Sequence, residues 1–270
     1  MGLTRMRLLQ FSDPHLVAAA DGLVRGRAPL AQLRAGLAAA TAALGGAPDL
    51  LLISGDLCHD ESWGGYAQLR DLLGELAWPA ALLCGNHDHP QLLRSALGRQ
   101  AWLAPLALEL AGVTLLLLDS HRPGTDAGHL GPRQLAWLRR QLAGLGDRPV
   151  LVAVHHPPVP IGDPALDAIA LVDAGALLEL LSPVPGLQAV LFGHVHQHWQ
   201  APLPGRPVGL PPALLLGCPS TLRGFGPVQP CPLGRADDPG GRLLELEAGR
   251  PLHQRLLRWP AVPLPAALPS

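Results

Sequence analysis

The chain has 270 residues, a formal net charge of −1 and 48% hydrophobic residues, which is the composition of a folded globular protein. The nearly balanced charge, with no lysine, excludes a strong field for nucleic acid or acidic lipid, so we expect neither partner. No apolar run approaches the ~18 residues of a membrane span, and the N-terminal apolar stretch is short, so we expect neither a spanning helix nor a signal peptide. The four cysteines form no CxxC pair, so we expect reduced thiols and a cytoplasmic protein.

The first hundred residues alternate predicted strands and helices. Near-continuous apolar runs predict three buried strands, at 6–11, 49–54 and 79–84. Leucines at helical spacing, with proline at two of the starts, predict three helices, at 29–44, 66–76 and 90–97. This alternation is typical of an α/β protein.

The rest of the chain continues the pattern. An Ala-Gly turn predicts a hairpin of strands 106–110 and 113–119. Further helices are expected at 131–145 and 171–181. Further strands are expected at 149–156, 187–193, 212–218, 242–249 and 253–259. We interpret residues 1–260 as one domain. A Gly/Pro-rich loop, 219–241, is a candidate lid or dimer element, and 261–270 is an Ala/Pro-rich tail.

Polar residues gather where the predicted strands end. Clusters with ligand-type side chains follow five strands: Ser12-Asp13-Pro14-His15, Gly55-Asp56-Leu57-Cys58-His59-Asp60, Gly85-Asn86-His87-Asp88, His155-His156 and Gly193-His194-Val195-His196. The carboxyl ends of strands are where α/β sheets bind ligands. Taken singly, each cluster could be a turn, a helix cap or a solvated strand end. Five such clusters together favour one shared site.

The donors in these clusters indicate which metals the site would take. Carboxylate, amide oxygen and imidazole without thiolate favour Mn, Fe or Zn. Seven donors are too many for one tetrahedral zinc. They suit two ions that share a bridging carboxylate.

The ordered set D-x-H, GD, GNHD, H and GHxH resembles the signature of the calcineurin-like metallophosphoesterases. That resemblance implies a four-layer α/β/β/α sandwich of two mixed β-sheets flanked by helices. It also implies seven ligands, with Asp56 bridging two ions: Asp13, His15 and His196 on one, and Asn86, His155 and His194 on the other. Fe, Mn or both are expected, with Zn as the alternative. Asn86, His87 and His196 are the expected substrate contacts.

A narrower resemblance runs through most of the chain. The segments LLLLDS, GHLGPRQLAWLRRQL, HHPPVP, GHVHQ and CPSTLRGF look like those of the bacterial class III cyclic-nucleotide phosphodiesterases. That resemblance implies hydrolysis of 3′,5′-cyclic AMP, or a related cyclic nucleotide, to the 5′-monophosphate. Attack would be in line, by a hydroxide bridging two ions about 3.5–4 Å apart.

Two residues beside Asn86 are expected to be catalytic. His87 is a candidate general acid or phosphate contact, with a purely supporting residue as the alternative. Asp88 would orient the His87 ring, or cap the following helix instead. His198 falls outside the motif and is expected at the surface or pocket rim. Phe225 would stack on a base or lie in the core.

Other functions of the same fold stay open. The substrate could be another small diester, such as a glycerophosphodiester or a nucleotide pyrophosphate. A protein phosphatase is disfavoured because GDLCHDES lacks the arginine expected there, and a nuclease because no basic track is evident. A non-catalytic scaffold is disfavoured because every ligand position is filled. A homodimer is compatible with the sequence.

Overall fold

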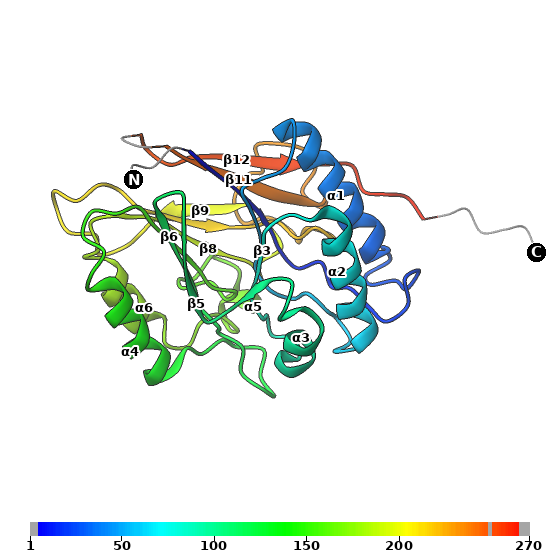
Figure 1. The fold of residues 1–270 in the computed structure, drawn as a ribbon, viewed down its shortest axis with the longest axis horizontal. Helices are drawn as coiled ribbons and strands as arrows, with labels where there is room; N and C mark the ends of the chain where they lie inside the picture. Colours follow the sequence, from blue (N-terminus) through cyan, green and yellow to red (C-terminus); the bar gives the residue numbers. More distant parts are fainter. Residues whose placement is uncertain (1–4, 248–249, 265–270) are drawn as a thin grey trace, which may run out of the picture.

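The computed structural model describes residues 5–247 and 250–264, which form two six-stranded sheets packed face to face (Figure 1). The strands of the first sheet lie in the order β12 (His253–Arg258), β11 (Gly240–Leu246), β1 (Met6–Phe11), β2 (Leu50–Ile53), β3 (Ala80–Leu82) and β4 (Trp102–Leu103). β1 to β4 run parallel, whereas β11 is antiparallel to both of its neighbours. The loops after β1, β2 and β3 therefore leave from one edge.

The second sheet repeats this plan. Its strands lie in the order β5 (Leu106–Leu110), β6 (Val113–Leu117), β7 (Val150–Ala153), β8 (Leu187–Phe192), β10 (Leu214–Gly217) and β9 (Trp199–Pro202). β6, β7, β8 and β10 are parallel, and the two edge strands are antiparallel to their neighbours. Both sheets are thus mixed, as expected.

Helices cover the outer face of each sheet. The first sheet carries α1 (Pro29–Leu44), α2 (Trp63–Leu76) and α3 (Pro90–Leu97), and the second carries α4 (Gly131–Leu142), α5 (Pro164–Asp167) and α6 (Ala174–Leu181). Figure 1 shows α1 to α3 on one side of the sheets and α4 and α6 on the other. The α/β/β/α sandwich predicted from the sequence is confirmed.

Alternation along the strands explains why the sheets stack. Leu8 and Leu52 face the second sheet in a fully buried central layer, where they meet Leu151 and Leu191. Leu9 and Phe11 point the other way, into the layer under α1 and α2. Each fully buried leucine stabilises the fold by roughly 1.5–3 kcal/mol relative to an exposed one.

Most predicted elements occur close to their expected bounds, and three short ones were not predicted: β4, α5 and β9. None of the helices within 5–247 and 250–264 is long and apolar enough to cross a membrane. The last two residues of the predicted strand 242–249, and residues 265–270 of the predicted tail, lie outside the described residues.

Candidate metal centre

The loops that follow β1, β2, β3, β7 and β8 bring all seven expected ligands together beyond the carboxyl ends of these strands. Six of these side chains are buried, and Asn86 is half-buried at the edge. Asp13 N donates to the carbonyl oxygen of Gly55 at 3.0 Å, which ties the first two loops together. The amide of His194 donates to the Asp13 carboxylate at 3.1 Å, which joins loops from different sheets.

One group of donors contains Asp13, His15, Asp56 and His196, whose ligand atoms all lie within 4.8 Å of one another. His15 Nε2 lies 3.1 Å from His196 Nε2 and 3.6 Å from Asp56 Oδ2. His196 Nε2 lies 3.5 Å from Asp13 Oδ1. The group contains the three residues expected on one ion, together with Asp56.

A second group lies on the other side of Asp56. The Oδ1 atom of Asp56 is 3.5 Å from His155 Nε2. Asn86 Oδ1 is 3.3 Å from His155 Nε2 and 3.1 Å from His194 Nδ1. The two oxygens of Asp56 therefore face the two groups separately, which is the placement that a bridging carboxylate needs.

The chemistry of the inward-facing atoms fits cations. His155 Nδ1 lies 2.8 Å from the carbonyl oxygen of Ser54, and His196 Nδ1 lies 3.2 Å from that of Arg223. A carbonyl oxygen only accepts, so both Nδ1 atoms carry a proton, and in the neutral form of each ring Nε2 points inward as a bare lone pair. They meet carboxylate and amide oxygens, which are acceptors too. A cation satisfies such a cluster of acceptors.

Shifted pKa values also keep three of the candidate ligands in the forms that bind cations. Burial lowers the pKa of His15 and of His194 to about 3, so both imidazoles are neutral. Burial alone would raise the pKa of Asp56, but the surrounding histidines outweigh it and lower the pKa below its usual range. Neutral imidazole and ionised carboxylate are the forms that bind metals.

His155 differs from the other ring ligands. Burial lowers its pKa, but the carboxylates of Asp56 and Asp13 outweigh burial and raise it above the usual value. In the absence of a cation this ring therefore tends to hold a proton. Metal binding at His155 would release that proton.

The backbone at the site is unusual. Asp13, His15, Asp56, His194 and His196 all have φ between 50° and 69°, a left-handed conformation that L-residues rarely adopt. Such residues persist only where surrounding structure holds them, and they cluster at functional sites. The surrounding structure therefore holds these five residues in conformations that they would not adopt alone.

His87 and Asp88 take different positions. The His87 amide donates to Asp56 Oδ1 at 3.0 Å, and its half-buried ring lies over His15 with ring centroids 5.0 Å apart. The buried Asp88 carboxylate accepts from the amides of Leu57, Cys58 and Gly85 and from the hydroxyl of Tyr66. Among the described residues it has no hydrogen bond to His87.

The helix-capping alternative for Asp88 is wrong. His89 is the N-cap of α3, and its side chain accepts from the amide of Leu92. Asp88 instead ties the loop after β3 to the loop after β2. Burial raises its pKa to about 7.

The loop 219–241 contributes one residue that the sequence did not single out, Ser220, and one that it did, Phe225. Ser220 Oγ donates to the Asp13 carbonyl at 2.7 Å, so the start of the loop 219–241 supports the first group. Phe225 stacks on the His196 ring with centroids 4.1 Å apart, and the guanidinium of Arg25 covers its other face at 4.5 Å. Both faces of Phe225 are occupied, which leaves none for a base.

Three more histidines lie close by. His59 contacts His15 and His87. His156 has both ring nitrogens engaged, with Ser120 Oγ at 2.8 Å and the Asp126 carbonyl at 3.0 Å. His198 is buried, not at the surface as expected, and its Nδ1 lies 3.1 Å from a guanidinium nitrogen of Arg242. Only tertiary structure brings these partners together.

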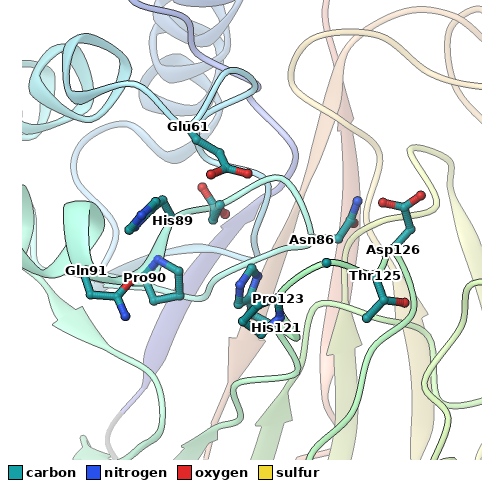
Figure 2. A pocket seen from close by; sticks show the side chains of 11 residues that line it. Glu61, Asn86, His89, Pro90, Gln91, His121, Pro123, Thr125 and Asp126 are labelled. Carbon is teal, nitrogen blue, oxygen red and sulfur yellow. The ribbon is translucent and has the colours of Figure 1, made fainter.

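A polar cavity of about 440 Å³ opens beside Asn86 (Figure 2). It is lined by residues of three segments: Glu61, Asn86, Asp88, His89, Pro90, Gln91, His121, Pro123, Gly124, Thr125 and Asp126. Figure 2 shows Asn86 and Asp126 on one side of it and His89 and Gln91 on the other. The cavity is therefore continuous with the second donor group and lined by carboxylates, imidazoles and amides.

Comparison with known proteins finds sequence similarity along most of the chain. Residues 6–198 match the calcineurin-like phosphoesterase family. A probable cyclic nucleotide phosphodiesterase of Synechococcus sp. (strain WH7803) is 49% identical over 264 residues, covering 94% of this chain and 97% of that protein. The 3′,5′-cyclic adenosine monophosphate phosphodiesterase CpdA of Escherichia coli (strain K12) is 34% identical over 256 residues, covering 92% and 87%.

Two further similarities are more limited. The glycerophosphodiester phosphodiesterase GpdQ of Enterobacter lignolyticus (strain SCF1) is 34% identical over 156 residues, covering 55% of this chain and 56% of that protein. The crystal structure of a dimetal phosphatase from Danio rerio superimposes with a TM-score of 0.63 at 15% identity, covering 96% of this chain and 99% of the other. At that identity the likeness is one of fold.

Proposed function

This chain belongs to the calcineurin-like phosphoesterase family, and from that premise we propose that it hydrolyses 3′,5′-cyclic AMP, or a related cyclic nucleotide, to the 5′-monophosphate. The observation that carries the proposal is the paired donor cluster around Asp56, complete in every expected ligand. The near full-length similarity to a probable cyclic nucleotide phosphodiesterase supports the substrate class.

Two ions are proposed to bind on either side of Asp56. Asp13, His15 and His196 would hold one, and Asn86, His155 and His194 the other. Nitrogen and oxygen donors without thiolate favour Fe or Mn, with Zn also compatible. Bound there, two cations supply charge neutralisation for the phosphate and an activated water.

The protein's own groups would then position the diester. Asn86 contacts His194 in one donor group, His196 contacts Asp13 in the other, and the His87 ring meets the His15 ring edge-on. We assign His87 the role of donating a proton to the departing alkoxide, which is a poor leaving group without one. Asp88 would act at a distance, by holding the His87 loop against the loop that carries Asp56.

The cavity beside Asn86 offers space for the organic part of the substrate. Carboxylate oxygens of Glu61 and Asp126 would accept hydrogen bonds from hydroxyl or amino groups, and His121 would offer a further polar contact. The acidic lining disfavours an anion there, which leaves the phosphate to the metal donors. A ribose or an amino-bearing base meets these requirements.

A second candidate substrate is another small diester, such as a glycerophosphodiester or a nucleotide pyrophosphate. The partial similarity to a glycerophosphodiester phosphodiesterase favours this alternative. Glycerol hydroxyl groups would meet the same acceptors in the cavity. The catalytic steps assigned to His87 and to the metal donors are the same in both cases.

The proposed setting is the cytoplasm. All four cysteines are unpaired, and three of them are buried, which supports a reducing compartment. Nucleic acid and membrane are not proposed as partners, because net charge is near zero. A homodimer and a lid role for the loop 219–241 stay predictions.

Reconstitution tests the proposal. Metal-stripped protein re-supplied with Mn²⁺ is expected to hydrolyse both cyclic AMP and bis(p-nitrophenyl) phosphate, and the Asp56→Ala variant to hydrolyse neither. Turnover of the aryl diester alone would indicate that the natural substrate is a phosphodiester other than cyclic AMP. Absence of turnover with two ions bound would overturn the enzymatic assignment.

A further inference from the structure

The outer ring nitrogens of the candidate ligands are held in two different ways. His155 and His196 each direct Nδ1 at a backbone carbonyl oxygen. His15 instead directs Nδ1 at another ring, with His59 Nδ1 3.2 Å away. A carbonyl fixes the neighbouring tautomer by itself, whereas an imidazole does so only if it is in the matching tautomer.

The position of His59 is fixed by its own backbone. Its amide donates to the Leu16 carbonyl at 2.7 Å, beside an isolated parallel bridge between Leu16 and Cys58. The loop after β2 is thereby joined to the loop after β1, which carries His15. His59 is held in place independently of any contact made by its ring.

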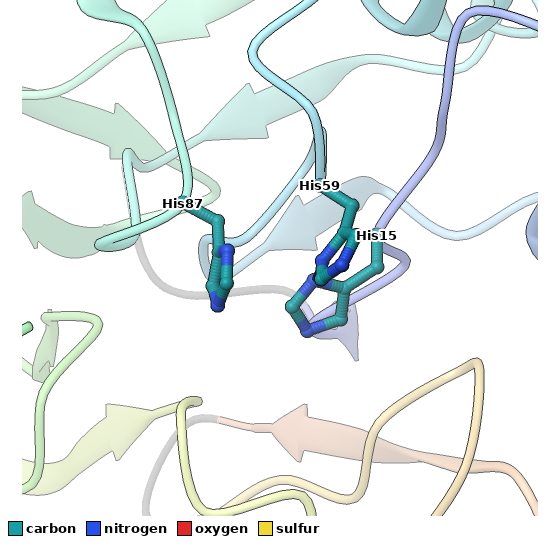
Figure 3. A group of neighbouring side chains, drawn as sticks. All are labelled: His15, His59 and His87. Atoms are coloured by element: carbon teal, nitrogen blue, oxygen red, sulfur yellow. Dashed lines mark hydrogen bonds between the residues drawn. The ribbon is translucent and has the colours of Figure 1, made fainter. Parts of the chain in front are cut away.

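The ring of His59 makes two contacts. It meets the His15 ring edge-on, with centroids 5.1 Å apart and planes at 76°. It stacks on the His87 ring with centroids 4.9 Å apart and planes at 28°. Figure 3 shows the three rings converging from three separate loops. His59 thus touches both a candidate ligand and the candidate proton donor.

We propose that His59 is a positioning residue for both neighbours. Its Nδ1 accepts the Nδ1 proton of His15, which leaves His15 Nε2 as the lone pair that faces Asp56 and His196. Its ring face supports His87 above the same donors. The role in positioning His87 rests on the proposed phosphodiesterase function, whereas the role toward His15 concerns metal binding alone.

A third metal site is the competing interpretation. Ring nitrogens of His15, His59 and His87 lie close enough together to hold an ion. His15 would then have to bind cations through both nitrogens, because its Nε2 already faces the first donor group. A neutral imidazole has one lone pair, so the positioning role is the better fit.

Two variants separate the acceptor from the ring. His59→Asn keeps an acceptor near the position of Nδ1 and removes the ring, and His59→Phe keeps the ring and removes the acceptor. We expect His59→Phe to weaken Mn²⁺ binding about tenfold or more, as the loss of a hydrogen-bond partner to a metal ligand does. We expect His59→Asn to bind Mn²⁺ within about threefold of the native protein.

The readout is the Mn²⁺ dissociation constant measured by calorimetry on metal-stripped protein, with no phosphodiester present. His253→Phe, an exposed position on β12, is the matched control and is expected to change nothing. Native-like affinity in both His59 variants, or equal loss in both, would overturn the proposal. Three ions in the native protein and two in His59→Phe would make His59 a ligand and overturn it too. Loss of cyclic AMP turnover alone would bear only on the proposed function.

A measurement on the unsubstituted protein covers the case in which a variant does not fold. In the zinc-loaded protein, ring nitrogen NMR shifts are expected to report a proton on Nδ1 of His15 and on Nε2 of His59. A proton on Nδ1 of His59 would reverse the hydrogen bond and overturn the proposal.

Discussion

His87 combines a fixed backbone and a packed ring with ring nitrogens that are free to contact a ligand. Its amide is bonded to the Asp56 carboxylate, while neither ring nitrogen has a hydrogen-bond partner in the part of the chain that the structure describes. By contrast, the two histidines of the first donor group, His15 and His196, each have an Nδ1 partner, which is the His59 ring for one and the Arg223 carbonyl for the other. A group held this way can exchange a proton with a ligand without disturbing the metal donors.

Replacing His87 by Asn is therefore expected to slow hydrolysis most for substrates whose leaving group needs a proton. With both ions bound, turnover of cyclic AMP should fall by about 10²-fold or more, because its alkoxide needs a proton. Turnover of bis(p-nitrophenyl) phosphate should fall by less than about tenfold, because its phenolate departs unaided. Steady-state kcat for the two substrates measures the difference. His129→Asn, at an exposed ring, is the control, and equal losses would contradict the proton-donor role.

At the scale of loops and strands, glycines determine how closely the donor loops approach. A Cβ atom at Gly85 would lie 2.1 Å from Asp56 Oδ1 and 2.7 Å from His155 Nε2. One at Gly193 would lie 2.0 Å from Ser12 Oγ. Each of these glycines directly precedes a candidate ligand. Glycine is needed at both positions because a side chain there would push the neighbouring loops apart.

Gly85→Ala should consequently damage both donor groups at once. We expect the Mn²⁺ dissociation constant to rise by more than about tenfold, since Asp56 and His155 must both move. Calorimetric titration of metal-stripped protein measures this. Gly144→Ala, where an added Cβ meets nothing within 4 Å, is the matched control. Unchanged affinity in Gly85→Ala would show that the loops can separate without loss of the site.

Hydrophobic pattern and motif spacing predicted the larger elements and the ligand loops, because both depend on local sequence. The helix 29–44 and the strand 6–11 occur as predicted. The four-residue α5 and the two-residue β4 are too short for any periodicity to show. The contacts of His59 and Phe225 arise from tertiary packing over long sequence separations, which no local pattern encodes.

Across the whole molecule, the two sheets are joined by polar contacts as well as by the central apolar layer. Arg242, on β11 of the first sheet, is fully buried and donates to the Gly217 carbonyl at 2.7 Å on β10 of the second. It also contacts Nδ1 of His198. Burial, followed by Arg242 and Arg258, lowers the pKa of His198 to about 4.

This contact predicts a pH dependence of stability. A histidine with a pKa of about 4 when folded and about 6.5 when unfolded takes up its proton mainly on unfolding between those values. The free energy of unfolding should therefore fall as pH drops from about 6.5 to 4, by up to about 1.4 kcal/mol per pH unit for this group. Above pH 6.5 the group contributes no slope.

Urea unfolding of metal-free protein at several pH values measures this slope. The His198→Gln variant keeps an acceptor for Arg242 and does not titrate, so its acid slope should be smaller by up to one proton. Other buried histidines, such as His15 and His194, contribute to both proteins equally and cancel in the comparison. Equal pH slopes of the free energy of unfolding in the native protein and in His198→Gln would contradict the lowered pKa of His198.

Five of the seven candidate ligands have left-handed backbones, and each such residue costs on the order of 1–3 kcal/mol. These conformations lower the free energy of unfolding, and burial of apolar side chains in the core offsets that loss. The site therefore reduces the stability of the fold in exchange for its chemistry. Replacing Asp56 by Gly or Asn would remove part of this strain and raise the stability of the metal-free protein, but it would also end turnover. Selection of variants for heat tolerance alone would thus erode the reaction. Engineering this enzyme calls for screening melting temperature and turnover together.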